Sequence, residues 1–534
     1  MHKNRLAAAR PVAVWREGGA VAASVVSIAE RVAAGAVRPT MVLAEHVARH
    51  RETHASLNAL VQPRHAAALL EAEQLESRLQ AGEQVGQLAG VPVSVKECFA
   101  VSGLVTSLGI ATRRQAVDVA DAPIVSCLRA AGAIIVGKGN VPQAMYLHET
   151  DNPVWGRTNH PLDATRGPGG SSGGDAALVA AGVVPLAVGT DLAGSIRQPA
   201  HACGISGFLP RSAVVGDGGA FDTVPHLSVV RPRAGFLARA VDDLARALAV
   251  VAAGSSSKPT IRDAEATPAG RRRGGLRVAW WDHAGPLAPS PAVRRGVHEG
   301  VSRLMQAGVE VVRLDGSLAT EAAWLHLALL SSDGGADIRR LFAGTRPIPP
   351  VARLLRLAGL PMWLRPLLAG LSQTVGGGIE AVALRATGPR RGAALASLCC
   401  RREAFATRFA SLVAPYDALV CPVSALPALP HGTAARLLVA AAPCLLANLL
   451  DLPAGTVPVT RVRPDEELGR VGSRDRVVRA AAAADRGSRN LPVGVQVVGV
   501  PGLASAEDPL RPERIVLDVM RLIEQGHDHH HNGG

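Results

Sequence analysis

Short β-branched runs that alternate with helical stretches constrain the fold of this chain more than any other feature of its sequence. Val91–Val95 and Ala133–Val136 are two such runs, and a helix through Ile124, Val125 and Leu128 separates them. A strand, a helix and a second strand in succession build a sheet that is covered by helices. The pattern therefore predicts the α/β class.

The same rhythm returns in the second half of the chain. Leu276–Trp281 is typical of a strand, and Ser290 is the expected N-cap of a helix that has Pro291 in its first turn. Gly308 ends that helix, and Val309–Leu314 is typical of the next strand. The apolar spacing predicts a buried helical stripe at Val293, Val297, Val301, Leu304 and Met305.

Composition narrows the class of protein. The 534 residues are 48% hydrophobic and 19% charged, which excludes a disordered chain and supplies a large core. The net charge of +13 rests on arginine, because only four of the 57 basic residues are lysines. The arginines are spread along the chain and aromatic residues make up only 3%, so we predict no nucleic-acid partner. The seven cysteines, odd in number and without metal-type spacing, indicate a reduced, intracellular compartment.

Four segments stand apart from the predicted core. Residues 1–26 form an N-terminal extension in which charged residues interrupt any secretory signal, and residues 461–489 form an Arg-rich insertion. Residues 351–371 are apolar but are cut by arginines and prolines, so they suit the surface of a membrane and not its interior, with a buried helical hairpin as the alternative. Residues 526–534 form a His-rich tail that we expect to be disordered, and we assign no metal site.

The stretch from Gly167 to Gly204 holds two serine sites. Ser171 lies in GGSSGG, which formally matches the G-x-S-x-G elbow of α/β-hydrolases but follows loop residues where an elbow needs a strand. Ser195 follows the strand-like run Val183–Val188 and ends the tight turn GTDLAGS. Consecutive amides in such a turn point at one place, which is how an oxyanion hole is built.

Lys96 adds a base to the two serines. It ends the strand predicted at Val91–Val95, and alternation along that strand turns its side chain inward. Burial lowers the pKa of a lysine, and a neutral lysine is a general base. Two serines and one such lysine suffice for acyl transfer without histidine, so His148, His160 and His201 are expected to be polar loop residues.

These motifs resemble the amidase signature family of serine hydrolases. The resemblance rests on GGSSGGDAALVAAG, GTDLAGSIRQPA and GVPVSVKE and extends over residues 27–525. It implies a single domain with a mixed central sheet covered by helices on both faces. It also implies that Ser195 is the acylating nucleophile, that Ser171, after a cis peptide bond, relays the proton, and that Lys96 is the base. The implied substrate-binding residues are Met145, Ser171, Leu192, Ala193, Gly194 and Ser195, with the last four amides holding the oxyanion.

Within the family, the chain resembles the fatty acid amide hydrolase branch. NVPQAM resembles the stretch that places Met145 against the acyl group, and residues 351–371 stand where that branch has a membrane-binding cap. Some positions depart from the family pattern. Ala193 stands where a second glycine is usual, and Gly139 stands where threonine is usual. The departures raise the question of altered specificity or reduced activity.

The expected function is hydrolysis of a carboxylic acid amide, with a fatty or other hydrophobic acyl group, through an acyl-enzyme and without a cofactor. We expect a small-molecule amide substrate and a cytoplasmic enzyme with peripheral membrane contact, and we leave a homodimer open. Two alternatives remain at this stage. One is the glutamine-hydrolysing subunit of a tRNA-dependent amidotransferase, and the other is a membrane-surface binding protein whose enzyme site has decayed at Ala193.

Overall fold

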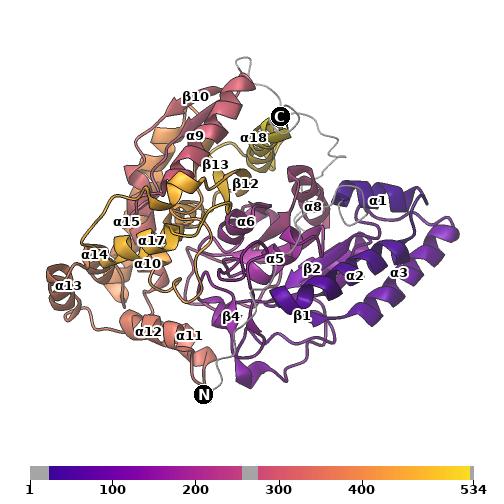
Figure 1. Cartoon of the computed structure of the whole chain (residues 1–534), viewed down its shortest axis with the longest axis horizontal. Coiled ribbons are helices and arrows are strands. Elements are labelled where there is room, and N and C mark those ends of the chain that lie inside the picture. Colours follow the sequence, from indigo (N-terminus) through magenta and orange to yellow (C-terminus); the bar gives the residue numbers. More distant parts are fainter. Residues whose placement is uncertain (1–22, 255–274, 529–534) are drawn as a thin grey trace.

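A single mixed sheet of eleven strands organises the computed structural model, which describes residues 23–254 and 275–528 (Figure 1). From one edge to the other its strands are β1 (Leu60–Pro63), β3 (Ile134–Gly139), β2 (Pro92–Lys96), β6 (Leu186–Asp191), β8 (Arg233–Ala238), β7 (Ser206–Leu209), β12 (Ala454–Arg461), β13 (Pro492–Gly499), β11 (Ala418–Pro422), β9 (Arg277–Trp280) and β10 (Glu310–Arg313).

The direction of the strands explains why the sheet is mixed. The strands β3, β2 and β6 run parallel to one another, and so do β10, β9 and β11. The remaining pairs in the sheet are antiparallel. Strands from the C-terminal part of the chain, β12 and β13, are therefore inserted next to strands from its first half. The prediction of a mixed central sheet is confirmed.

Helices cover both faces of this sheet, and the apolar side chains of its strands belong mainly to two cores. One core contains side chains from α2 (Pro39–Leu57), α3 (His65–Gln80), α5 (Gly173–Ala180) and α6 (Arg197–Cys203). The other contains side chains from α1 (Val25–Ala33), α4 (Pro123–Ala130), α8 (Val241–Gly254), α9 (Pro291–Gln306) and α18 (Arg511–Asp528).

The other elements surround these layers. Short pieces connect the strands: η2 (Ala111–Arg113), η3 (Gln143–Met145), β4 (Asp151–Asn152), β5 (Gly156–Arg157) and α7 (Ser212–Val215). A helical region between β10 and β12, at the left of Figure 1, contains α10 (Ser317–Leu330), α11 (Ala336–Leu341), α12 (Pro349–Ala358), α13 (Arg365–Thr374), α14 (Gly378–Ala386), α15 (Gly392–Val413), η4 (Leu438–Cys444) and α16 (Leu445–Leu449). Between β12 and β13 lie η5 (Pro464–Leu468) and α17 (Arg476–Asp485).

Most elements expected from the sequence are present. The helix at Ser290 begins as predicted, and the hydroxyl of Ser290 accepts the amide of Val293. Met305 is the exception in its buried stripe, since 60% of its surface is exposed. The strand expected at Val183–Val188 begins later, at Leu186. No strand is predicted from the sequence between α2 and α3, but the structure has β1 there, because Leu60–Pro63 pairs along β3.

The four segments set apart in the sequence have different outcomes. Residues 351–371 include most of α12 and α13, and residues 461–489 include η5 and α17. Residues 1–22 of the N-terminal extension and residues 529–534 of the His-rich tail lie outside the described residues. Within the described parts of the chain, no helix is both long and apolar enough to cross a membrane.

Candidate active site

Strand β2 turns Lys96 toward helix α5. Val93 and Val95 on β2 belong to the core on one face of the sheet. Because alternate side chains point to opposite faces, Ser94 and Lys96 project to the other side, where α5 lies. Lys96 has no exposed surface, so the inward position predicted from the sequence is confirmed.

The amino group of Lys96 is held by hydroxyl and carbonyl groups. Its Nζ lies 2.7 Å from Ser171 Oγ and 2.7 Å from Thr190 Oγ1, and it also donates to the Thr190 carbonyl at 3.1 Å. Among the described residues it forms no ion pair. Burial lowers the pKa of Lys96, and the charges of Cys98, Asp175 and Asp191 only partly oppose this. The site therefore favours the neutral amine.

Ser171 lies in the loop before α5, where the peptide bond from Gly170 is cis, as the family resemblance implied. Two hydrogen bonds join this loop to the turn that carries Ser195. The amide of Ser172 donates to the Ser195 carbonyl at 3.1 Å, and the amide of Gly170 donates to Gln198 Oε1 at 3.0 Å. The two serine sites of the sequence are thus adjacent in space.

Ser195 follows β6 in the turn that leads into α6, and the carboxylate of Asp191 holds this turn together. Asp191 accepts the amides of Gly194 at 2.7 Å and Ile196 at 3.1 Å. The Gly194 amide, one of the four predicted to hold an oxyanion, is thus already bonded to Asp191, whereas the other three are those of Leu192, Ala193 and Ser195. Among the described residues these three amides have no hydrogen-bond partner.

A buried ion pair anchors the turn to the C-terminal half of the chain. Arg197 Nη2 lies 2.9 Å from Asp191 Oδ1, and both side chains are fully buried. Burial alone would raise the pKa of Asp191, but Arg197 holds it well below its usual range. Arg197 also donates to Gln496 on β13 and Asn448 on α16, two residues that sequence reasoning missed. The only sign of Gln496 and Asn448 in the sequence is that each is a polar residue within an otherwise apolar run.

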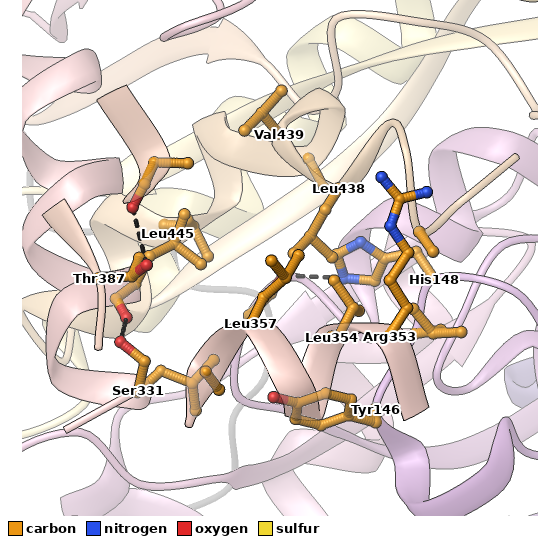
Figure 2. Close-up of a pocket in the computed structure, with 18 of the residues that line it drawn as sticks. Tyr146, His148, Ser331, Arg353, Leu354, Leu357, Thr387, Leu438, Val439 and Leu445 are labelled. Atoms are coloured by element: carbon orange, nitrogen blue, oxygen red, sulfur yellow. Dashed lines mark hydrogen bonds between the residues drawn. The ribbon is translucent and has the colours of Figure 1, made fainter. Parts of the chain in front are cut away.

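Ser195 opens onto a cavity of about 330 Å³. Of the predicted substrate-binding residues, Met145, Leu192, Ala193 and Ser195 line the cavity, whereas Ser171 and Gly194 do not. Figure 2 shows its apolar wall, which includes Leu354, Leu357, Leu438, Val439 and Leu445.

The three histidines near the motifs have different positions, and the expectation of polar loops is wrong for His201, which lies in a helix. His201 is fully buried in α6, between the carbonyls of Leu426 and Gly494. His160 is a loop residue, but it is buried and bonded to the Ala202 carbonyl. His148 is a loop residue, but it lines the cavity beside Ser195.

Behind Lys96 lies a second carboxyl group, that of Asp175 in the first turn of α5. It is fully buried, and its Oδ1 accepts the hydroxyl of Ser94 at 2.8 Å. Burial raises the pKa of Asp175 to about 7, against the effects of Ser94 and Lys96. A Cβ atom at Gly139 would overlap this carboxylate. The departure from threonine at position 139 therefore makes room for Asp175.

One group with metal-type donors exists among the described residues, formed by His226, Asp333 and Asp337. Its donors already have partners: His226 Nδ1 lies 2.7 Å from Asp337 Oδ2, and Asp337 pairs with Arg340. The carboxylate of Asp333 accepts backbone amides of Gly335 and Asp337. We assign no ion to it.

The layered sheet, with a buried lysine bonded to a serine behind an apolar cavity, defines a hydrolytic enzyme of the α/β class. The chain belongs to the amidase family, whose model matches residues 41–503. The family and its relatives are amide hydrolases, so the prediction of an amidase is confirmed.

Individual relatives agree with this assignment. Fatty-acid amide hydrolase 1 of Sus scrofa is 32% identical over 468 residues, which are 84% of this chain and 78% of that protein. A glutamyl-tRNA(Gln) amidotransferase component of Acidothermus cellulolyticus is 33% identical over 349 residues, 62% of this chain and 68% of that one. The solved structure of a fatty acid amide hydrolase matches 94% of this chain and 85% of its own, with a TM-score of 0.78 and 21% identity, which confirms the fold.

Proposed function

We propose that the protein hydrolyses amides of hydrophobic carboxylic acids through Ser195, Ser171 and Lys96. The observation that carries this proposal is the buried Lys96, held within hydrogen-bond distance of Ser171 Oγ at 2.7 Å, next to the turn that exposes Ser195 to the cavity. Burial favours the neutral amine, which is the form that accepts a proton.

In the first half of the reaction, Ser195 Oγ forms a bond to the carbonyl carbon of the amide. Its proton passes to Ser171 Oγ as the proton of Ser171 passes to Lys96 Nζ. The free amides of the turn stabilise the negative oxygen. The C–N bond then breaks, the leaving amine takes a proton from Ser171, and the proton on Lys96 replaces it.

In the second half, water attacks the acyl-enzyme. Its proton follows the same route to Lys96, and its oxygen forms a bond to the acyl carbon. The bond to Ser195 Oγ then breaks, and the proton returns through Ser171 to Ser195. The products are a carboxylic acid and an amine, and Lys96 is neutral again for the next cycle.

The lining of the cavity supports a hydrophobic acyl group. Its wall carries Leu192, Leu327, Leu354, Leu438 and Leu445 among other apolar residues. Burying an acyl chain against such a wall contributes about 0.8 kcal/mol per methylene. Glutamine is the substrate in the amidotransferase alternative, and its polar side chain gains little binding free energy from an apolar wall. We therefore favour an acyl amide as the substrate.

The helices α12 and α13 support peripheral membrane contact. Val351 and Leu355 are buried, so α12 is attached to the body of the protein by one face. On α13 and the turn before it, Trp363 is 77% exposed, Leu367 70% and Leu371 63%. An exposed apolar surface of this kind suits a membrane interface. A hydrophobic acyl amide also partitions into the membrane interface.

Labelling with a fluorophosphonate probe tests the catalytic assignment. We expect wild-type protein to be labelled, Ser195→Ala not at all, and Ser171→Ala and Lys96→Ala much more slowly. Labelling that persists in Ser195→Ala and vanishes in Ser171→Ala would make Ser171 the nucleophile. No labelling of wild type at any pH would favour the decayed binding protein.

Flotation with anionic liposomes tests the membrane contact. We expect wild type to float and the double variant Trp363→Ser and Leu367→Ser to remain in the soluble fraction. Leu70 is 59% exposed on α3, on the opposite side of Figure 1 from α13, so Leu70→Ser is the matched control. Equal flotation of the double variant and the control would rule out α13 as the contact.

A further inference from the structure

His148 is bonded to the turn that carries Ser195. Its Nε2 lies 3.1 Å from the carbonyl oxygen of Ala193. A carbonyl oxygen only accepts hydrogen bonds, so Nε2 must carry the proton and donate it. This contact fixes the tautomer of the imidazole, and the proton of a neutral ring cannot then be on Nδ1.

The ring of His148 is neutral over the working range of pH. Burial lowers its pKa to about 4, with Asp191 opposing the shift and Lys96 and Arg197 adding to it. These three residues lie on β6, β2 and α6, the elements packed behind the turn. Above about pH 5, Nδ1 therefore holds a free lone pair.

The second ring nitrogen of His148, Nδ1, is not used by the described part of the protein. Among the described residues it has no hydrogen-bond partner, and it is not enclosed by protein. His148 lines the same cavity as Ser195, and Figure 2 shows its ring at the wall. The wall around Ser195 thus presents amides that donate and one ring nitrogen that accepts.

We propose that Nδ1 of His148 accepts a hydrogen bond from the N–H of the scissile amide, and that this contact makes the enzyme prefer primary and secondary amides to esters. The inference rests on the proposed function. The amides of the turn receive the carbonyl oxygen, and His148 is bonded to a residue of that turn, two positions from Ser195. The hydrogen donor closest to the carbonyl carbon of an amide is its own N–H. An ester or a tertiary amide has no hydrogen there.

Substrate pairs that differ only in this hydrogen test the proposal. An acyl p-nitroanilide is compared with the p-nitrophenyl ester of the same acid, and with the N-methyl anilide. Wild type, His148→Phe and His148→Gln are assayed at pH 8. The ester is the internal control, because its hydrolysis uses the same nucleophile and the same oxyanion amides. Thermal melting confirms that each variant is folded.

We expect His148→Phe to lower kcat/KM for the anilide about 3- to 10-fold more than for the ester, the loss of one hydrogen bond. The N-methyl anilide should behave as the ester does. Glutamine keeps an acceptor and a donor, so His148→Gln should recover most of the preference. Equal losses on anilide and ester would show that His148 only positions the turn, and no loss on either would show that it does not contact the substrate; both overturn the proposal. Failure of wild type to hydrolyse any of the three would refute the amidase function itself.

Discussion

The ends of β2 and β3 each carry a buried lysine, and the two lysines have different partners. Lys138 Nζ lies 2.7 Å from the carboxylate of Asp118. Lys96 is bonded to two hydroxyls and a carbonyl and to no carboxylate among the described residues. Burial lowers the pKa of both, but for Lys138 contact with Asp118 opposes this directly. The contact with Asp118 therefore favours the protonated form of Lys138, whereas Lys96 has no such contact within the described chain and, in the proposed mechanism, is neutral.

Replacing each lysine in turn is the strongest test of this contrast. We expect Lys96→Met to reduce amide hydrolysis by about 10²–10⁴, the range for loss of a general base. Lys138→Met should leave the rate per folded molecule nearly unchanged, because Lys138 contacts neither serine. Initial rates of anilide hydrolysis, divided by the concentration of folded protein, measure both. A similar loss in Lys138→Met would contradict the assignment of the base.

Removing the charge of Asp118 tests the comparison of the two lysines by taking away the partner of Lys138. Asp118→Asn leaves a buried ammonium without its partner, which costs about 3–5 kcal/mol of stability. We expect a lower denaturation midpoint in urea and an unchanged rate for the folded fraction. Lys138→Met combined with Asp118→Leu should regain part of the stability. An unchanged midpoint in Asp118→Asn would mean that the pair adds no stability.

A methyl group at Gly139 tests how closely the Lys96 site is packed. A Cβ atom there would overlap the carboxylate of Asp175, so we expect Gly139→Ala to cost about 1–3 kcal/mol. Differential scanning calorimetry measures the loss. Asp175→Ala in the same chain should restore part of it, because it vacates the space. Failure of the second change to help would place the strain elsewhere.

The charge of Asp175 should move the pH profile of the base. The pKa of Asp175 is raised to about 7, so near neutral pH this group acquires a negative charge, which favours protonated Lys96. Asp175→Asn removes that charge and lowers the pKa of Lys96 further. Since neutral Lys96 is the active form, the rise of kcat/KM with pH should shift to lower pH by about one unit. Ser94→Ala is the smaller change in the same direction, because it removes a hydrogen bond that stabilises the carboxylate. A shift to higher pH would contradict this account.

The sequence identified Lys96 through its rarity and its place in an alternating strand, and the structure confirms that it is buried. The same rarity did not separate it from Lys138, whose role depends on a contact with Asp118 in a distant loop. His148 was set aside for a similar reason. Its tautomer follows from one tertiary contact with Ala193, which no local pattern shows.

The strands and helices were easier to predict than the hydrogen bonds between residues far apart in the sequence. Strand and helix periods are local, so β2, β3, β9 and α9 follow from the residues themselves. Asn448 and Gln496 are about 250 and 300 residues from Arg197 along the chain, and only the folded sheet brings them together. Hydrophobic patterns do not record pairings of this range.

Strand β13 supports the turn with Ser195, although it follows that turn by about 300 residues in the chain. The turn with Ser195 is complete in sequence by residue 195, but its anchor at Gln496 is among the last parts of the sheet to leave the ribosome. A nascent chain that lacks β13 therefore carries the nucleophile on an unsupported turn. We therefore expect a chain truncated before β13 to show no hydrolysis, even though it contains all three proposed catalytic residues.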